Sequence, residues 1–169
     1  RRILKPHGSL MVCGSHHNIP TVDQVLKRTG WWVNQWIAWC IPNAFPNREC
    51  AQMASSNQTI IWARPGKGRA FYNAAQAKTY QADKDGVPVN MRDFWVINND
   101  AQQVRKYPFL KGHGAKKPPA LVARAIDIAT KDEPGVVVYD PFLGVGDDVG
   151  VPTHAFEFLN PALGGGLAQ

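Results

Sequence analysis

The sequence has no long hydrophobic run and no start that resembles a secretion signal. No stretch of about 18 apolar residues occurs among its 169 residues, so we expect no membrane span. Residues 1–8 lack an extended apolar region and a small-residue cleavage site, so we expect no signal peptide. The chain does not begin with Met, and we therefore expect it to be part of a longer protein. These features predict a cytoplasmic protein without a membrane partner.

Cysteine is scarce, and its spacing argues against a metal site. The three cysteines, Cys13, Cys40 and Cys50, form no C-x-x-C pair and lie in or near apolar segments. We expect reduced thiols in a cytosolic protein and no bound metal. The adjacent pair His16–His17 has no acid or cysteine partner nearby, and neighbouring loop residues point apart, so we expect a surface loop there.

Positive charge exceeds negative charge. Lys and Arg number 19 against 13 Asp and Glu, which gives a formal net charge of +6. Such an excess favours a polyanionic partner. A mildly basic soluble protein fits the charge equally well, so charge alone leaves both interpretations open.

Apolar runs and turn residues predict a series of short elements. Thr21 is a plausible N-cap for a helix that ends before Gly30, and Pro118 fits the first turn of a second helix. The tryptophans of the predicted strands are expected mostly in the core. The expected strands are 9–14, 31–41, 59–63, 136–139 and 155–159, and the expected helices are 22–28 and the segment from 118 to about 129. This order predicts an α/β fold with an open, mostly parallel sheet.

The segment VVVYDPFLGVG, residues 136–146, has the pattern of a ligand site. Its nearly all-apolar strand predicts a parallel sheet covered on both faces. Asp140 follows that strand, and Gly144 and Gly146 allow backbone amides to approach a ligand closely. Because open α/β sheets bind ligands at the carboxyl ends of their strands, we expect a small-molecule site here.

Between residues 67 and 114 the regular pattern weakens, and cations alternate with aromatic side chains. Cations among stacking rings suit nucleic acid. An irregular surface insert with its own small core would have the same composition, and both interpretations stay open at this point. The candidate DNA-binding residues of this segment are Arg69, Lys78, Arg92, Arg105 and Lys106.

Several segments together share their order and spacing with one enzyme family. They are LKPHGSL (4–10), GWW (30–32), PNAFPN (42–47), TIIWA (59–63), NMRDFW (90–95), HGAKKP (113–118) and DPFLGVG (140–146). In this set the chain resembles the β-type adenine-N6 or cytosine-N4 DNA methyltransferases, which use S-adenosylmethionine. The resemblance covers nearly the whole chain and implies DNA methylation, as in restriction–modification, by an enzyme with a Rossmann-like methyltransferase fold.

The resemblance also implies roles for particular positions. Residues 1–66 correspond to the catalytic-side half of the sheet, 67–114 to a target-recognition insert that reads double-stranded DNA, and 115–169 to the cofactor-binding half. The matching position for an acid that hydrogen-bonds the cofactor ribose is Glu157. The residues implied to hold S-adenosylmethionine are Asp140, Pro141, Phe142, Gly144, Gly146, Lys117, Pro118 and Glu157.

The chain departs from the family pattern at several functional positions. The family's catalytic segment, Asp or Asn followed by Pro-Pro and an aromatic residue, is not present, and the only Pro-Pro is Pro118–Pro119. The resemblance therefore assigns no catalytic residue, and it implies that a central strand is supplied by upstream sequence, a second chain or a homodimer. Asp147–Asp148 replace two hydroxyl residues after the glycine turn, and Asn57–Gln58 replace His-Glu. A second hypothesis is thus a non-catalytic, basic nucleic-acid-binding relative.

Overall fold

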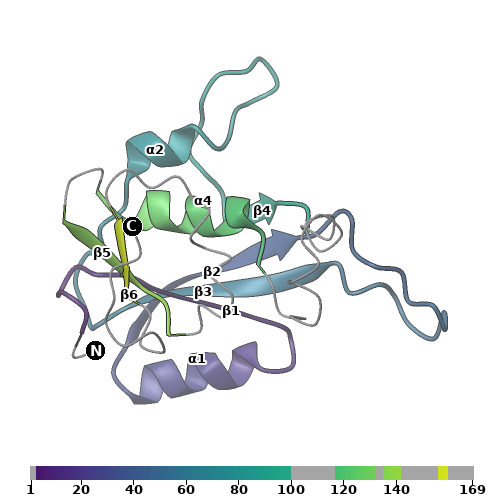
Figure 1. The fold of residues 1–169 in the computed structure, drawn as a ribbon, viewed down its shortest axis with the longest axis horizontal. Helices are drawn as coiled ribbons and strands as arrows, with labels where there is room; N and C mark the ends of the chain where they lie inside the picture. The colour runs from purple at the N-terminus through teal and green to yellow at the C-terminus, as the bar shows by residue number, and fades with distance from the viewer. Residues whose placement is uncertain (1–2, 100–116, 132–134, 142–155, 160–169) are drawn as a thin grey trace.

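The computed structural model describes residues 3–99, 117–131 and 135–141, together with the backbone of 156–159 (Figure 1). Among these residues three helices separate the strands, except that β3 follows β2 directly, and the last helix precedes a separate pair of strands. In chain order the elements are β1 (Leu10–Gly14), α1 (Ile19–Arg28), β2 (Trp32–Cys40), β3 (Asn57–Arg64), α2 (Ala74–Lys78), β4 (Phe94–Val96), α4 (Pro119–Ala129), β5 (Val136–Tyr139) and β6 (Phe156–Leu159). No helix within these ranges is both long and apolar enough to cross a membrane.

The larger sheet is mixed, which corrects the expectation of a mostly parallel sheet. Its strand order is β1-β3-β2-β4; β3 is antiparallel to both β1 and β2, and β4 is parallel to β2. The chain reverses through residues 41–56, so β3 returns directly beside β2 as the second strand of a hairpin. Because β3 lies between β1 and β2, those two strands point the same way, and their carboxyl ends lie at one edge.

A second sheet contains only β5 and β6, which pair in parallel with Val136 opposite Phe156. The strands stand where the sequence predicts them, but β5 is not covered on both faces. Its exposure alternates, with Val137 51% and Tyr139 42% exposed. Among the described residues nothing buries that second face, so the expectation of a doubly covered strand is wrong here.

The main core lies between the four-stranded sheet and α4. The strands contribute Trp39, Trp62 and Trp95, at most 8% exposed, and α4 contributes Leu121 and Ile128. The expectation that strand tryptophans pack in the core holds for Trp39 and Trp62. It is wrong for two further tryptophans of β2, which lie on opposite faces of the sheet: the first pairs with Arg64 on the face of Trp62, and the second pairs with Ile61 on the α1 face. These are Trp32 and Trp36, each 44% exposed.

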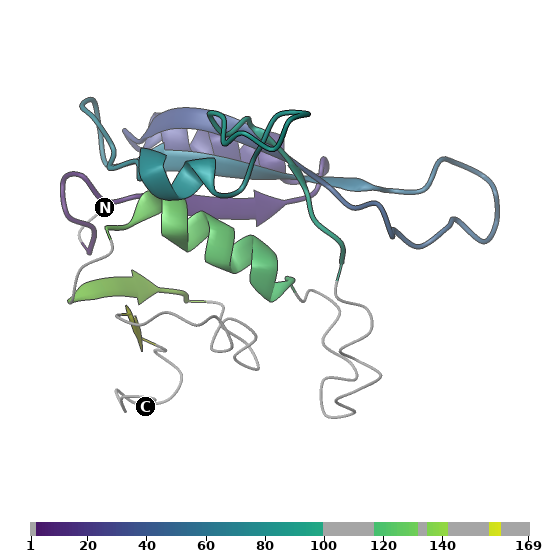
Figure 2. The same cartoon turned by 90° about the horizontal axis from the view of Figure 1, so that it is seen from above.

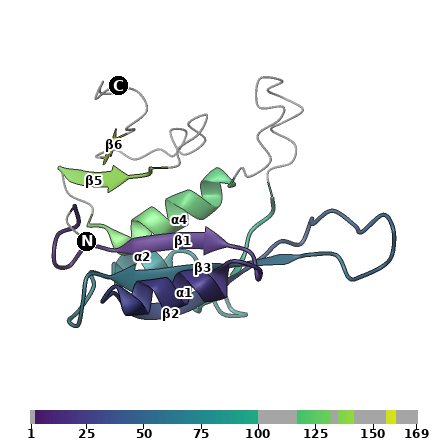
Figure 3. The same ribbon diagram turned by 90° about the horizontal axis from the view of Figure 1, so that it is seen from below.

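Helix α1 covers the opposite face of the sheet (Figures 1 and 3). Its buried Ile19 and Leu26 pack against Ile61 and Ala63 of β3. The helix begins at Ile19, three residues earlier than the sequence predicts, so Thr21 lies inside the first turn and is not the N-cap. The N-cap is Asn18, whose side chain makes no capping hydrogen bond.

Gly14 lets α1 approach the end of β1 closely. A Cβ atom on this residue would lie 2.5 Å from Asn18 Oδ1 and 2.9 Å from Ile19 Cγ1, closer than real contacts allow. Gly14, the last residue of β1, is therefore also the place where α1 packs against the sheet.

The segment 67–114 contains two elements that the sequence pattern did not predict. Helix α2 packs against α4, and β4 extends the four-stranded sheet. Trp95 of β4 is 2% exposed, and Ala77 of α2 is fully buried in the same core. Residues of this segment that the structure describes thus share a hydrophobic core with the sheet.

Candidate cofactor and nucleic-acid sites

Several strand ends that the sequence marks as functional lie at one edge of the molecule. Strands β1, β2 and β4 end there because of their pairing. Strand β5 runs in the same direction as β1, and α4 runs the opposite way, so the start of α4 faces this edge (Figures 2 and 3). Three segments that are distant in sequence, the ends of β1 and β5 and the start of α4, therefore face the same side.

Asp140 follows the last residue of β5, and its side chain is half-buried, whereas Pro141 is exposed. Glu157 is the second residue of β6 and pairs with Val137, so it lies within that strand and not at its end. The remaining predicted cofactor residues, Phe142, Gly144 and Gly146, lie outside the described residues. Their roles stay predictions.

The lysine–proline segment reaches the carboxyl end of β1. Pro118 is buried and is the N-cap of α4. Lys117 lies close enough to Cys13 of β1 for its charge to act on the thiol: burial raises the pKa of Cys13, and the positive charge of Lys117 offsets part of that rise. Cys13 Sγ donates a hydrogen bond of 3.4 Å to Gln58 Oε1. A thiol whose pKa is raised stays protonated at neutral pH, which does not suit a nucleophile.

Two of the predicted DNA-binding cations lie in one locality. Lys78 ends α2, and Arg92 precedes β4; both are exposed. The backbone N–H of Arg92 donates to Gln81 Oε1 at 2.8 Å, and Trp95 Nε1 donates to the carbonyl of Arg92 at 3.1 Å. These bonds tie the chain after α2 to the start of β4.

The other predicted DNA-binding residues do not join this group. Arg69 is exposed, and no contact found within the described ranges connects it to Lys78 or Arg92. Arg105 and Lys106 lie outside those ranges. The assignment of all five residues to DNA stays a prediction.

Arg124 is a residue that the sequence pattern did not single out. Its guanidinium carbon lies 4.8 Å from the ring centroid of Tyr80 and 5.6 Å from that of Trp95. Burial lowers its pKa, although the nearby Tyr80 opposes that change. Along the sequence this arginine reads as one polar position of an amphipathic helix. Only the packing of α4 against residues 80 and 95 places it within cation–π distance of two rings.

Tyr80 and Asp127 complete this cluster. The Tyr80 hydroxyl donates a short hydrogen bond to Asp127 Oδ2. The pKa of Tyr80 is raised, first by burial and then by that hydrogen bond and the charge of Asp127, with Arg124 acting in the opposite direction. Asp127 lies one turn after Arg124 in α4, so helix geometry brings both to the insert.

The described part of the chain has no group of three or more His, Cys, Asp or Glu side chains that could hold a metal ion. His16 and His17 are exposed in the turn before α1. Their ring centroids lie 3.9 Å apart, so the two rings do not point away from each other as the sequence suggested.

Known proteins match this chain over most of its length. A family model described as DNA methylase matches residues 1–148. The type II methyltransferase M2.DpnII of Streptococcus pneumoniae is 33% identical over 148 residues, which are 86% of this chain and 52% of that protein. M2.LlaDCHI of Lactococcus lactis subsp. cremoris is 32% identical, over 86% of this chain and 51% of its own length. The chain thus spans about half the length of these relatives.

Solved structures share the fold at lower sequence identity. The PvuII cytosine-N4-specific DNA methyltransferase has a TM-score of 0.70 at 19% identity, covering 93% of this chain and 60% of its own. The M1.HpyAVI–SAM complex has a TM-score of 0.61 at 20% identity, covering 94% and 71%. These similarities are to the fold and add no information on individual site residues.

Proposed function

The chain belongs to the DNA methylase family of N6-adenine and N4-cytosine methyltransferases, and we propose that it forms the cofactor-binding and DNA-reading part of a site-specific enzyme of this kind. The substrate would be double-stranded DNA, and the methyl acceptor the amino group of an extruded adenine or cytosine. The match of the family model to residues 1–148 carries the proposal, because it spans the insert and every segment implied to hold the cofactor except that of Glu157.

The described residues fit S-adenosylmethionine. Asp140 places a half-buried carboxylate directly after β5, where open α/β sheets bind small ligands. Such a group is suited to the ammonium of an amino-acid moiety. Pro118 and Lys117, at the start of α4, would line the same edge, together with Pro141 and the glycine turn that follows it. When bound, S-adenosylmethionine supplies an electrophilic methyl group on a positively charged sulfur.

In this proposal the residues of the chain bind and orient. Asp140 would hold the ammonium group of the donor, and Glu157 would accept hydrogen bonds from the ribose hydroxyl groups. The exposed cations Lys78 and Arg92, with Arg69, would neutralise DNA phosphates and fix the position of the duplex. Recognition of the target sequence would fall to the insert at residues 67–114.

A further polypeptide segment would complete the enzyme. The 169 residues do not include the Asp/Asn-Pro-Pro-aromatic motif that accepts hydrogen bonds from the target amine and stacks the flipped base. Within the described ranges, β1 pairs only with β3 and β5 only with β6, so each has an edge without a described neighbour. Open edges favour the addition of a strand. We propose that upstream sequence, a second chain or a homodimer contributes both the motif and a strand.

Calorimetric titration of S-adenosylmethionine into the purified chain tests the cofactor assignment. We expect binding that Asp140→Ala reduces at least tenfold, because an ammonium–carboxylate contact contributes about 1.5–3 kcal/mol. Asp85→Ala, which removes an exposed acid at a distant turn, is the matched control and should bind as the unsubstituted chain does. Equal binding by Asp140→Ala and the unsubstituted chain would refute the assignment of Asp140.

The catalytic part of the proposal has its own test. Mixing the chain with a polypeptide that carries the missing motif should give methylated DNA. If folded chain binds DNA but neither binds S-adenosylmethionine nor supports methylation in such mixtures, the non-catalytic DNA-binding relative is the correct description.

A further inference from the structure

Arg124 of α4 has a nitrogen without a partner. Its Nε is buried and makes no hydrogen bond, and it is the only such side-chain atom found among the described residues. The residue as a whole is half-buried, so other parts of it retain access to solvent. Buried polar atoms in proteins nearly always have a partner, and an exception calls for an explanation such as an absent ligand.

Aromatic rings orient the guanidinium. Tyr80 and Trp95 both lie within cation–π distance of its central carbon, at 4.8 Å and 5.6 Å. Trp95 is itself fixed, because it is 2% exposed and donates a hydrogen bond to Arg92. Stacked arginines keep their edge donors available and lose little further freedom when these donors bind an anion.

Asp127, one turn along α4 from Arg124, bonds to Tyr80 and, among the described residues, forms no ion pair with Arg124. In the described part of the chain, no carboxylate forms an ion pair with Arg124. A planar guanidinium in this state matches the paired oxygens of a phosphate diester.

Two other cations belong to the segments that contribute the two rings. Arg92 is linked to Trp95 by the hydrogen bond described above, and Lys78 ends the helix that leads into Tyr80. Both are exposed. Cations next to stacked aromatic side chains are the pattern by which proteins bind a nucleic-acid backbone.

We propose that Arg124 binds a phosphate of the DNA, held in position by Tyr80 and Trp95. This inference rests on the proposed function, since it takes DNA as the substrate. It adds a contact from α4, the helix that begins at the lysine–proline segment of the cofactor side. DNA bound through Arg124 would therefore lie against both the insert and the helix that leads to the methyl-donor segments.

The salt dependence of DNA binding tests this inference. The affinity of the full chain for a double-stranded oligonucleotide is measured by fluorescence anisotropy at several salt concentrations. Loss of one phosphate contact makes the slope of log affinity against log salt less negative by about 1. We expect this change in Arg124→Met, together with affinity roughly fivefold to tenfold lower at 0.1 M salt. Methionine keeps an unbranched stem that can still pack beside the two rings.

Matched variants separate charge, packing and position. Arg28→Gln removes a cation from exposed α1, on the opposite face of the sheet, and should leave the slope unchanged. Arg124→Lys keeps the positive charge but loses the planar guanidinium with its paired donors. It should therefore retain most of the salt-dependence slope and bind DNA more weakly. Circular dichroism and thermal unfolding verify that each variant is folded, and Arg124→Gln replaces Arg124→Met if the latter does not fold.

The outcomes distinguish this inference from the proposed function. An unsubstituted chain that binds no DNA refutes both. Strong DNA binding with the same slope and affinity in Arg124→Met refutes the phosphate contact alone. An equal change of slope in Arg28→Gln also refutes it, because the effect would then follow net charge and not the position of Arg124.

Discussion

The four-stranded sheet and the β5–β6 pair are made of similarly apolar strands, yet they are buried to different degrees. In β3, residues 60 to 63 are between 0% and 8% exposed. In β5, Val137 is 51% and Tyr139 is 42% exposed. Strand β3 has a paired neighbour on each side and helices over both faces of its sheet (Figure 1), whereas β5 has a described neighbour on one side only.

The well-buried sheet and the segment proposed to bind the cofactor are therefore different parts of the molecule. The four-stranded sheet has the packing of an independent core, but a two-stranded sheet is at best marginally stable in water. The segment that we propose for S-adenosylmethionine is attached to the less covered pair. We therefore expect the cofactor half to depend on a ligand or on an additional polypeptide segment, and the other half to depend on its own core.

The largest expected effect comes from emptying the larger core. Trp39 is 1% exposed, and its Nε1 donates to the carbonyl of Ile97 at 2.9 Å. Trp39→Ala should lower the free energy of unfolding by about 3–5 kcal/mol, measured by denaturant titration. Phe94→Ala, at a residue 58% exposed, should change it by no more than about 0.5 kcal/mol. A similar loss in both variants would contradict the burial difference.

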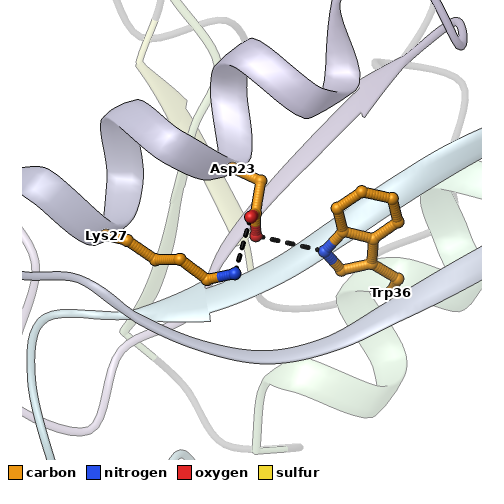
Figure 4. Close-up of polar contacts among 3 residues, drawn as sticks. All are labelled: Asp23, Lys27 and Trp36. Carbon is orange, nitrogen blue, oxygen red and sulfur yellow. Dashed lines mark hydrogen bonds and ion pairs between the residues drawn. The ribbon is translucent and has the colours of Figure 1, made fainter.

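The α1 face contains a polar interaction that should contribute less. Asp23 is 8% exposed; its carboxylate accepts a hydrogen bond from Trp36 Nε1 at 3.2 Å and pairs with Lys27 Nζ at 2.6 Å (Figure 4). Asp23→Ala should cost about 1–3 kcal/mol in unfolding free energy, because it leaves the indole N–H without this acceptor. Lys27→Ala should cost less than about 1 kcal/mol, since that side chain is 61% exposed. A larger effect at Lys27 would reverse this ranking.

Asp147 and Asp148 should lower the affinity of the chain for S-adenosylmethionine, because they repel its carboxylate. If these acids lie close to the carboxylate of bound S-adenosylmethionine, each opposes binding by roughly 1 kcal/mol at moderate screening. Asp147→Ser with Asp148→Thr should therefore raise the affinity for S-adenosylmethionine, by about fivefold per acid in low salt. Calorimetry at low and high salt checks this, and the gain should shrink as salt screens the charges. An unchanged affinity would mean that the two acids point away from the ligand.

The Tyr80–Asp127 contact predicts that the unfolding free energy of the larger sheet and its helices depends on pH. The pKa of Tyr80 is raised in the folded state, mainly by burial. Its stabilising contribution is complete below the unfolded pKa of about 10 and decreases as pH rises above that value, because the unfolded chain then ionises more readily. Unfolding free energy should fall less steeply above pH 10 in Tyr80→Phe than in the unsubstituted chain. Parallel pH profiles would contradict this assignment.

The smallest effect is expected in β5. Val137→Ala should change the unfolding free energy by less than about 0.5 kcal/mol, because half of the side chain is already exposed. Ile61→Val removes one carbon from a fully buried site of β3 and should cost about 0.5–1.5 kcal/mol. If Val137→Ala costs more than Ile61→Val, residues outside the described ranges cover β5, and the contrast between the two sheets disappears.

Local patterns predicted most elements but not their neighbours. The apolar runs located the strands within about two residues at each end, and the helical spacing from Pro118 located α4. The start of α1 was missed because the prediction placed the cap at Thr21, although Asn18 followed by Pro20 in the first turn also marks a helix start. Helix α2 and strand β4 were missed because they are five and three residues long, too short to show a period.

The candidate site residues also divide into those that local patterns predicted and those that they did not. Asp140, Lys117 and Pro118 came from local motifs, and the structure places them near strand or helix ends at one edge. Arg124 was not predicted, since its partners Tyr80 and Trp95 are 44 and 29 residues away along the chain. A pattern of nearest neighbours contains no signal for such a contact.

The sequence by itself determined most of the elements, the motif order and, through that order, the family. These depend on interactions between residues a few positions apart, which periodicity and turn chemistry express directly. Only the tertiary structure decided the order β1-β3-β2-β4, the exposure of one side of β5 and the position of Arg124 close to two rings. Those features depend on contacts between residues that are far apart in the sequence. The free energy of burying their surfaces is shared among all of these residues, so no short stretch of sequence contains the information.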